Sequence, residues 1–311
     1  MPEISVIICT HDPREDYLRR TLEALEQQSL PLDQWELLLI DNASKQPLAG
    51  KWDLSWHPMA RHIREDELGL TPARLRGIYE AAGELVIFVD DDNLLATNYL
   101  AEALSIETEF SLLGAWGGEV SGEFEQAVQP WAKSRLSSLA VRELGRDHWS
   151  NQYSWDSAPC GAGLCVRKTV ADFYAAQIQG DALRLELDRR GQRLSGCGDM
   201  DLAFTACDMG LGMGRFKRLC LLHLIPPGRL QLSYFKRLFE GNGYSEVILA
   251  AVRGTYFPTS RFNKLRTLGR ALISSRIERQ LALARLKGAR AAERDLAKVQ
   301  RMSPDRSAIR N

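Results

Sequence analysis

Short apolar runs alternate with amphipathic segments along the first 120 residues of the chain. Runs rich in Val, Ile and Leu are typical of buried parallel strands, and they cover residues 4–9, 35–40 and 85–89. Apolar residues at helical spacing predict helices over residues 17–28, 71–82 and 97–110. A further strand is predicted over 115–120. This rhythm predicts an α/β fold with a doubly wound, mostly parallel sheet flanked by helices.

The second half of the chain has a less regular pattern. Residues 123–156 mix aromatic and charged side chains, and the pattern assigns no element there. Strands are predicted over 162–167 and 215–223, with a helix over 199–209 between them. Residues 230–300 have a helical pattern in which Leu265, Leu268 and Leu272 lie among many Arg and Lys residues.

Polar side chains follow each of the three apolar runs in the first half. They are Thr10-His11-Asp12, Asp41-Asn42 and Asp90-Asp91-Asp92. Because parallel strands end at one edge of a sheet, these segments are expected to converge on one crevice. Strand alternation would place Asp90 and Asp92 on the same side. Clustered carboxylates suit Mg²⁺ or Mn²⁺ carrying substrate phosphates, and a solvated acidic turn is the alternative.

Charge and composition narrow the class of protein. The formal net charge is zero, but residues 261–311 hold 14 Lys and Arg against 4 Asp and Glu. An acidic body with a basic tail is therefore expected, and nucleic-acid binding is not favoured because no recognition motif accompanies the basic residues. The six cysteines have no C-x-x-C spacing, which argues against a structural zinc site. Without a signal-peptide pattern or an 18-residue apolar run, a cytoplasmic protein is expected.

Four motifs in order resemble those of the family 2 glycosyltransferases. They are residues 4–14, 39–44, 73–78 and 86–92, and the similarity extends over about residues 3–240. The resemblance implies a GT-A fold, which is a nucleotide-binding Rossmann-like sheet joined to an acceptor-binding part. It also implies an inverting, metal-dependent transferase that uses a nucleotide-diphosphate sugar and a saccharide or glycolipid acceptor.

The resemblance implies roles for the residues at the strand ends. It places Asp41 on the base and Asp92 on the metal. The residues implied to contact the nucleotide sugar are Thr10, His11, Asp12, Arg14, Asp41, Asn42, Arg74, Asp90 and Asp91. For Arg74, a surface salt bridge is the alternative to a phosphate contact.

Residues in the second half complete the expected site. Asp199, in a segment similar to the family's Gly-Glu-Asp-x-Asp-Leu pattern, is implied to be the general base, with helix capping as the alternative. Asp201 is the reserve candidate. Gly161 and Gly163 are expected in a loop near the donor sugar, or only in a turn. His223 is implied to lie near the metal or diphosphate, with a structural histidine as the alternative.

The resemblance and the charge pattern together suggest a domain organisation. A GT-A catalytic domain is expected over 1–228, with a nucleotide-sugar half over about 1–120 and an acceptor half over about 121–228. A helical basic extension would follow over 229–311. Its basic amphipathic helices predict contact with an anionic membrane surface, as a peripheral protein of the inner face, or packing against the catalytic body or another subunit.

The predicted function is sugar transfer with inversion to a hydroxyl acceptor, in the synthesis of a cell-surface polysaccharide, lipopolysaccharide or glycolipid. A nucleotidyltransferase is disfavoured because residues 10–14 are not Gly-rich. A catalytically silent sugar-nucleotide-binding or scaffold protein is the other alternative, since Gly198 replaces the family's Glu.

Overall fold

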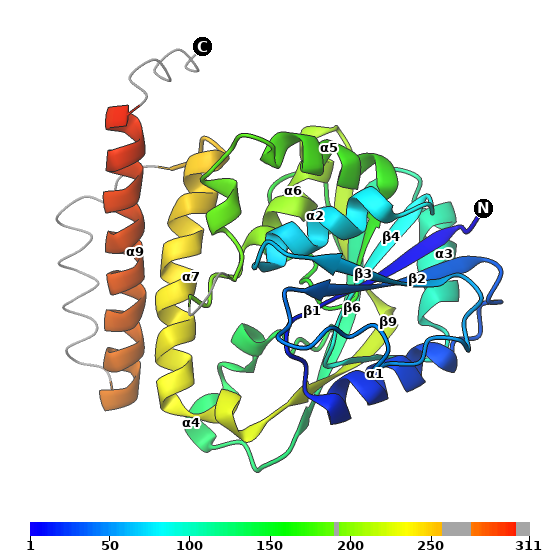
Figure 1. Ribbon diagram of the computed structural model, residues 1–311. Helices are drawn as coiled ribbons and strands as arrows, with labels where there is room; N and C mark the ends of the chain where they lie inside the picture. Colours follow the sequence, from blue (N-terminus) through cyan, green and yellow to red (C-terminus); the bar gives the residue numbers. More distant parts are fainter. Residues whose placement is uncertain (190–192, 257–274, 303–311) are drawn as a thin grey trace. The chain divides into compact units, whose positions relative to one another are not determined.

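The computed structural model describes residues 1–189, 193–256 and 275–302 (Figure 1). The predicted helical residues Leu265, Leu268 and Leu272 lie outside these ranges. The strands are β1 (Ile4–Thr10), β2 (Trp35–Asn42), β3 (Ala60–Glu65), β4 (Leu85–Asp90), β5 (Asn93–Leu95), β6 (Leu113–Phe124), β7 (His148–Ser150), β8 (Leu164–Arg167) and β9 (Gly212–Ile225). The helices are α1 (Glu15–Glu26), α2 (Leu70–Glu80), α3 (Tyr99–Glu109), α4 (Pro130–Lys133), α5 (Lys168–Ile178), α6 (Gly198–Asp208), α7 (Leu232–Val252) and α9 (Arg276–Met302). Short 3₁₀ helices are η1 (Leu136–Leu139), η2 (Arg184–Glu186) and η3 (Pro227–Leu230).

Nine strands form one sheet in the part of the chain that the structure describes. Their order is β3-β2-β1-β4-β8-β6-β9-β5, and β7 pairs with β9. The longest ladders, β1 with β2 and β6 with β9, are parallel, whereas β8 pairs antiparallel with both β4 and β6. The prediction of an α/β fold with a mostly parallel sheet flanked by helices is confirmed.

Helices cover both faces of the sheet. On one face α2 contacts β1 and β2, and α5 contacts both α2 and α6. Figure 1 shows α1 below the sheet, opposite α2, α5 and α6. Gly77 lets α2 lie close to β1, because a Cβ at this position would lie 2.5 Å from Cγ2 of Ile7.

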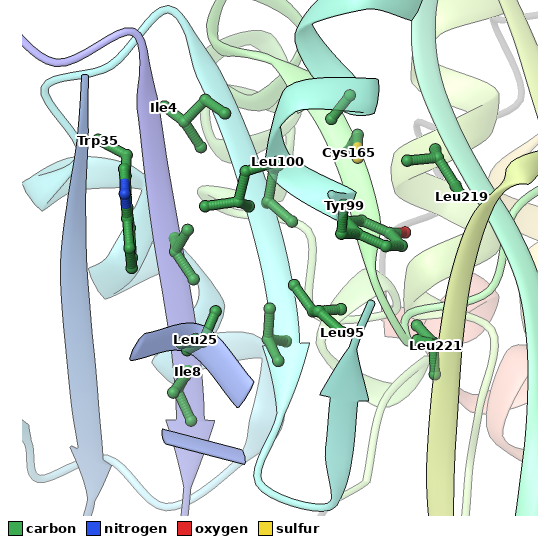
Figure 2. Close-up of a cluster of buried hydrophobic side chains, with 14 of the residues drawn as sticks. Ile4, Ile8, Leu25, Trp35, Leu95, Tyr99, Leu100, Cys165, Leu219 and Leu221 are labelled. Atoms are coloured by element: carbon green, nitrogen blue, oxygen red, sulfur yellow. The ribbon is translucent and has the colours of Figure 1, made fainter. Parts of the chain in front are cut away.

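The hydrophobic core lies on the α1 and α3 side of the sheet. Alternate residues of β1 and β4 enter it and meet Leu18, Leu22 and Leu25 of α1. Figure 2 shows Ile4, Ile8, Leu25 and Trp35 at one end of this cluster, and Tyr99, Cys165, Leu219 and Leu221 toward the other. One continuous core therefore joins the parallel strands to the mixed part of the sheet and fixes the strand ends.

The pattern missed several elements. β3 was not predicted because only Ile63 of its six residues is buried, so this strand at the edge of the sheet lacks an apolar run. The described helix α5 was also missed, although its buried residues Val170, Ala171, Tyr174 and Ile178 have helical spacing. The predicted strand over 85–89 is β4, which includes Asp90. Asp91 and Asp92 lie in a turn, so the predicted strand alternation does not extend from Asp90 to Asp92.

The chain divides into two compact units. The first comprises Met1–Gly180 and Gly198–Pro227 and contains the sheet. The second joins Asp181–Cys197 to the chain from Gly228 onward, including α7 and α9. The predicted boundaries at about 120 and 228 stay predictions. None of the helices in the described ranges is both long enough and apolar enough to span a bilayer.

Two glycines let α7 and α9 pack closely within the second unit. A Cβ on Gly288 would lie 1.8 Å from the carbonyl oxygen of Glu240, and one on Gly243 would lie 2.1 Å from that of Arg285. Buried Leu281 and Leu296 line α9 along the same contact. The obstructing atoms are backbone, so the helices cannot approach this closely with a larger side chain in place.

We expect Gly288→Ala to lower the free energy of unfolding by roughly 1–3 kcal/mol, because the added methyl overpacks the helix contact. Helix propensity alone predicts the opposite sign, since Ala favours helix over Gly by about 1 kcal/mol. Thermal and urea unfolding would measure the change. The matched control is Gly145→Ala, where nothing lies within 4 Å of the added Cβ. A Gly288→Ala protein as stable as wild type would contradict the close contact.

Candidate active site

The carboxyl ends of β1, β2 and β4 lie side by side. In the parallel register Thr10 is opposite Asp41, and Cys9 is opposite both Ile40 and Asp90. The three polar segments predicted to converge are therefore brought together at one edge of the sheet. Ligands of open α/β sheets bind at this edge.

Backbone strain marks the same edge. Asp12 (φ 45°) and Ala43 (φ 53°), which follow β1 and β2, are in the left-handed region although neither is glycine. The backbone N–H of Asp12 donates to Oγ of Ser44 (3.0 Å), and that of Lys45 donates to Oδ1 of Asp12 (2.9 Å). These bonds hold the two strained loops together. Strain maintained by the surrounding structure is common at binding sites.

His11 joins the same pair of loops. Its Nδ1 lies 2.7 Å from the backbone carbonyl of Asn42, and because a carbonyl only accepts, Nδ1 carries the proton and donates. The side chain of Asn42 is buried and bonds to the backbone at Glu67 and Gly69, which fixes the chain entering α2. The hydrogen bond between the Lys45 backbone and Asp12 lowers the pKa of the Asp12 carboxyl.

Asp41 is held in place by its own loop. Its carboxylate accepts from the backbone N–H groups of Ser44 and Leu48, both at 3.1 Å, and from the Arg64 guanidinium at 2.8 Å. Burial opposes the charged form, but these bonds outweigh it and lower the pKa of Asp41. Arg64, on the unpredicted strand β3, is a site residue that the pattern missed.

The aspartate triplet separates into different environments. Asp91 accepts a hydrogen bond from the Thr10 hydroxyl. Asp92 is buried, and its Oδ2 lies 3.5 Å from Nε2 of His223, which is also buried. His223 reaches this position because β9 pairs antiparallel with β5, with His223 opposite Asn93. The two predicted metal ligands, 131 residues apart in sequence, are thus neighbours.

The predicted donor loop meets the start of α6. The backbone N–H of Gly161 donates to Oδ2 of Asp199 (2.7 Å), and that of Met200 donates to Oδ1 (2.8 Å). A Cβ on Gly161 would lie 2.6 Å from Nη2 of Arg74, so Arg74 and Asp199 border the same glycine. Asp199 is the second residue of α6, within the helix rather than at the position that precedes it.

Buried Cys160 shows how close the two halves of the site are. Burial raises the pKa of its thiol, and the negative charges of Asp199 and Asp90 raise it further. The end of β4 and the start of α6 are therefore both close enough to Cys160 to influence its charge.

Asp201, the reserve candidate for the general base, is fully buried.

Not every predicted residue joins this group. The guanidinium of Arg14 lies 2.8 Å from Glu125 and 3.8 Å from the centre of the Tyr17 ring, in an ion-pair cluster beside α1. Gly163 (φ 68°) uses its carbonyl to accept from the buried Tyr99 hydroxyl (2.6 Å), so it braces the loop that carries Gly161. The ligand roles of all the predicted residues stay predictions.

Part of the chain matches a known sequence family. Residues 5–118 match the sequence family described as glycosyl transferase family 2. The predicted resemblance to this family is therefore confirmed over residues 5–118. The family 2 region contains β1, β2 and β4 and ends within β6, so it includes the strand ends described above.

Individual relatives share only part of their length with this chain. It is 27% identical over 95 residues to the glycosyltransferase AglE of Haloferax volcanii, and 33% identical over 110 residues to N-acetylgalactosaminyltransferase 7 of Drosophila melanogaster. These matches cover 30% and 34% of this chain, and 31% and 19% of the relatives. The crystal structure of S. aureus TarS 1–349 aligns with a TM-score of 0.49 at 16% identity, over 96% of this chain and 92% of that one.

The Asp41 contacts predict a pH-dependent stability. We expect Asp41→Asn to lower the free energy of unfolding at pH 7 by roughly 1–3 kcal/mol, because two backbone donors and Arg64 lose a charged acceptor. The folded-state pKa is depressed below 3.8, so the contribution is present above that pH and is lost as pH falls through the folded-state value.

Urea unfolding of wild type and Asp41→Asn between pH 7 and 3 would measure this, with the exposed Asp33→Asn as control. The difference between wild type and Asp41→Asn should shrink toward acid pH. A difference that stays constant with pH would contradict the charged role.

Proposed function

We propose that this protein is an inverting, divalent-metal-dependent glycosyltransferase that moves a sugar from a nucleotide-diphosphate donor to a hydroxyl acceptor. The observation that carries the proposal is the meeting of Gly161, Arg74 and Asp199 beside the strand ends of a family 2 region. This arrangement offers a carboxylate for the acceptor hydroxyl and a guanidinium cation for the diphosphate.

The donor nucleotide would lie across the ends of β1 and β2. Asp41 is proposed to receive a base N–H with its remaining lone pairs, since its two oxygens have the capacity for about four hydrogen bonds. Thr10, Asp12 and Asn42 shape the same edge through the bonded loops. Arg74 would contact the diphosphate, because a guanidinium pairs well with phosphate oxygens.

A divalent cation fits between Asp92 and His223. Oδ2 of Asp92 and Nε2 of His223 are 3.5 Å apart. The carboxylate is a ligand type that suits Mg²⁺ and Mn²⁺, and histidine is a common ligand of metal ions. Among the described residues, no group of three or more His, Cys, Asp or Glu side chains gathers as a complete metal site. Such ions are commonly held by one or two protein ligands plus substrate phosphates. When bound there, the ion would neutralise charge that develops on the departing diphosphate.

Asp199 is proposed to accept the acceptor's proton. As the hydroxyl oxygen forms a bond to the anomeric carbon, its proton passes to the Asp199 carboxylate. The bond from that carbon to the diphosphate oxygen breaks, and its electron pair leaves with the diphosphate. Attack from the face opposite the leaving group inverts the configuration. The hydrogen bonds from Gly161 and Met200 hold the carboxylate in one orientation, which is what a general base requires.

As the wider role, we propose synthesis of a cell-surface polysaccharide, lipopolysaccharide or glycolipid on the cytoplasmic side, with the basic helices at an anionic membrane surface. A silent sugar-nucleotide-binding protein is the alternative, favoured by Gly198. The orientation of Asp199 toward the Gly161 loop supports the enzyme.

Nucleotide binding tests the proposed donor site. UDP, GDP and dTDP, each with and without Mn²⁺, would be titrated calorimetrically into wild type and Asp92→Ala. We expect one nucleotide to bind in a metal-dependent way and Asp92→Ala to weaken it by about tenfold or more, since a charged ligand is lost. Asp33→Asn, which changes an exposed carboxylate, should bind as wild type does. No binding of any nucleotide would contradict the donor site.

Asp199→Asn tests the base. We expect kcat to fall by about 10²- to 10⁴-fold while the donor dissociation constant changes little, because the amide cannot take the proton. Transfer would be followed by release of the nucleoside diphosphate, and the product's anomeric configuration by NMR. Unchanged turnover in Asp199→Asn, or retention of configuration, would rule out the proposed step.

A further inference from the structure

Two arginines beside the proposed site have no role in the mechanism above. Arg215 lies on β9, and Arg142 is bound through its backbone to Val120 of β6, with N···O distances of 2.8 and 3.0 Å in the two directions. Both side chains are half-buried. Within the described ranges neither guanidinium forms an ion pair with a carboxylate, and Nε of Arg215 is buried without a hydrogen-bond partner. A buried cationic donor without a partner is costly unless a ligand supplies one.

The strand register places Arg215 toward the loop that carries Gly161. Arg215 is opposite Gly117 of β6, and paired residues of neighbouring strands project to the same face. A Cβ on Gly117 would lie 2.9 Å from Cβ of Pro159, so this loop covers that face. Cys160 and Gly161 follow directly, and Gly161 bonds to Asp199. The arginine is therefore on the same side as the proposed base.

The electrostatics show that the two arginines and the loop share one environment. Burial lowers the pKa of Arg215, and the positive charge of Arg142 lowers it further, whereas Cys160 and Asp156 act in the opposite direction. Arg142 also lowers the pKa of the Cys160 thiol. Because an arginine does not lose its proton in proteins, two like charges remain together near Cys160. An anion between them would relieve both the repulsion and the desolvation.

Exposed aromatic rings border the same loop. The Tyr153 ring stacks on Phe204 of α6 at a centroid distance of 5.0 Å, and Trp155 meets Phe204 edge-on at 6.2 Å. Both residues nevertheless remain largely exposed to solvent, with exposed fractions of 43% for Tyr153 and 52% for Trp155. Exposed aromatic clusters of this kind mark binding surfaces. Trp155 directly precedes Asp156, whose charge acts on Arg215, so an exposed aromatic residue is next in sequence to a residue of the arginine environment.

We infer that Arg142 and Arg215 form a subsite for an oxyanion carried by the acceptor, so that the acceptor is a saccharide bearing a phosphate or carboxylate group. This rests on the proposed function, because the acceptor hydroxyl is placed on Asp199. The donor's diphosphate is assigned to Arg74 and the Asp92 end, which leaves the arginine pair to the other substrate. Guanidinium groups match phosphate and carboxylate oxygens with paired hydrogen bonds.

Calorimetric titration of the full chain tests the subsite. Inorganic phosphate, methyl phosphate, glucuronate and glucose would be titrated into wild type, Arg142→Gln and Arg215→Gln. The control is Arg146→Gln, which changes an exposed arginine of the same segment. We expect a phosphate or glucuronate to bind wild type and the control, with each of the two variants weaker by about tenfold or more. Glucose alone should not show this dependence.

Arg215→Lys, which keeps the charge, should recover part of the affinity if the variants are folded. Equal affinity in all the proteins, or no binding of either oxyanion to wild type, would overturn the subsite. Binding of UDP, GDP or dTDP to the same samples reports on the proposed donor site separately. If wild type binds no nucleotide, that result counts against the proposed function. The phosphate titration can still be interpreted separately.

Discussion

The parallel register of β1, β2 and β4 is the constraint on which the rest of the site depends. It aligns Thr10 with Asp41 and Cys9 with Asp90, and so brings three distant segments to one edge. The register is fixed because alternate residues of these strands enter one core with α1 and α3. A shift by one residue would turn every core side chain to the other face. The packing that stabilises the sheet thus also positions the candidate site.

The mixed half of the sheet carries site residues that the parallel strands β1, β2 and β4 do not. β8 pairs antiparallel with β4, which brings the loop before β8, with Gly161, to the end of β4. β9 pairs with β5 and carries His223 to Asp92, and in another part of the same strand it carries Arg215 toward that loop. β9 therefore carries both His223 and Arg215, and the loop before β8 carries Gly161. The site is an assembly of the two halves within one core.

The sequence predicted the parts of the fold where burial is complete. β1, β2 and β4 are buried on both faces and read as continuous apolar runs, and their polar ends marked the site. β3 was not predicted because an edge strand buries few side chains. Arg64 lies on β3, so this partner of Asp41 was missed as well. Arg142 and Arg215 gave no local signal, since their importance arises from the pairing of β6 with β9 and from the missing counter-charge. Contacts between distant segments, rather than local patterns, define these positions.

A metal-bound nucleotide is proposed to lie at the carboxyl edge of the sheet, next to His223. This placement can be tested by paramagnetic broadening of the side-chain NMR signals of the five histidines when Mn²⁺ is added with UDP, GDP or dTDP. His57 is an internal reference, because it packs on Trp35 at 4.1 Å, at the opposite end of β2. We expect the His223 signals to broaden before those of His57. Broadening of His57 before His223, or none at His223 with any nucleotide, would contradict this placement.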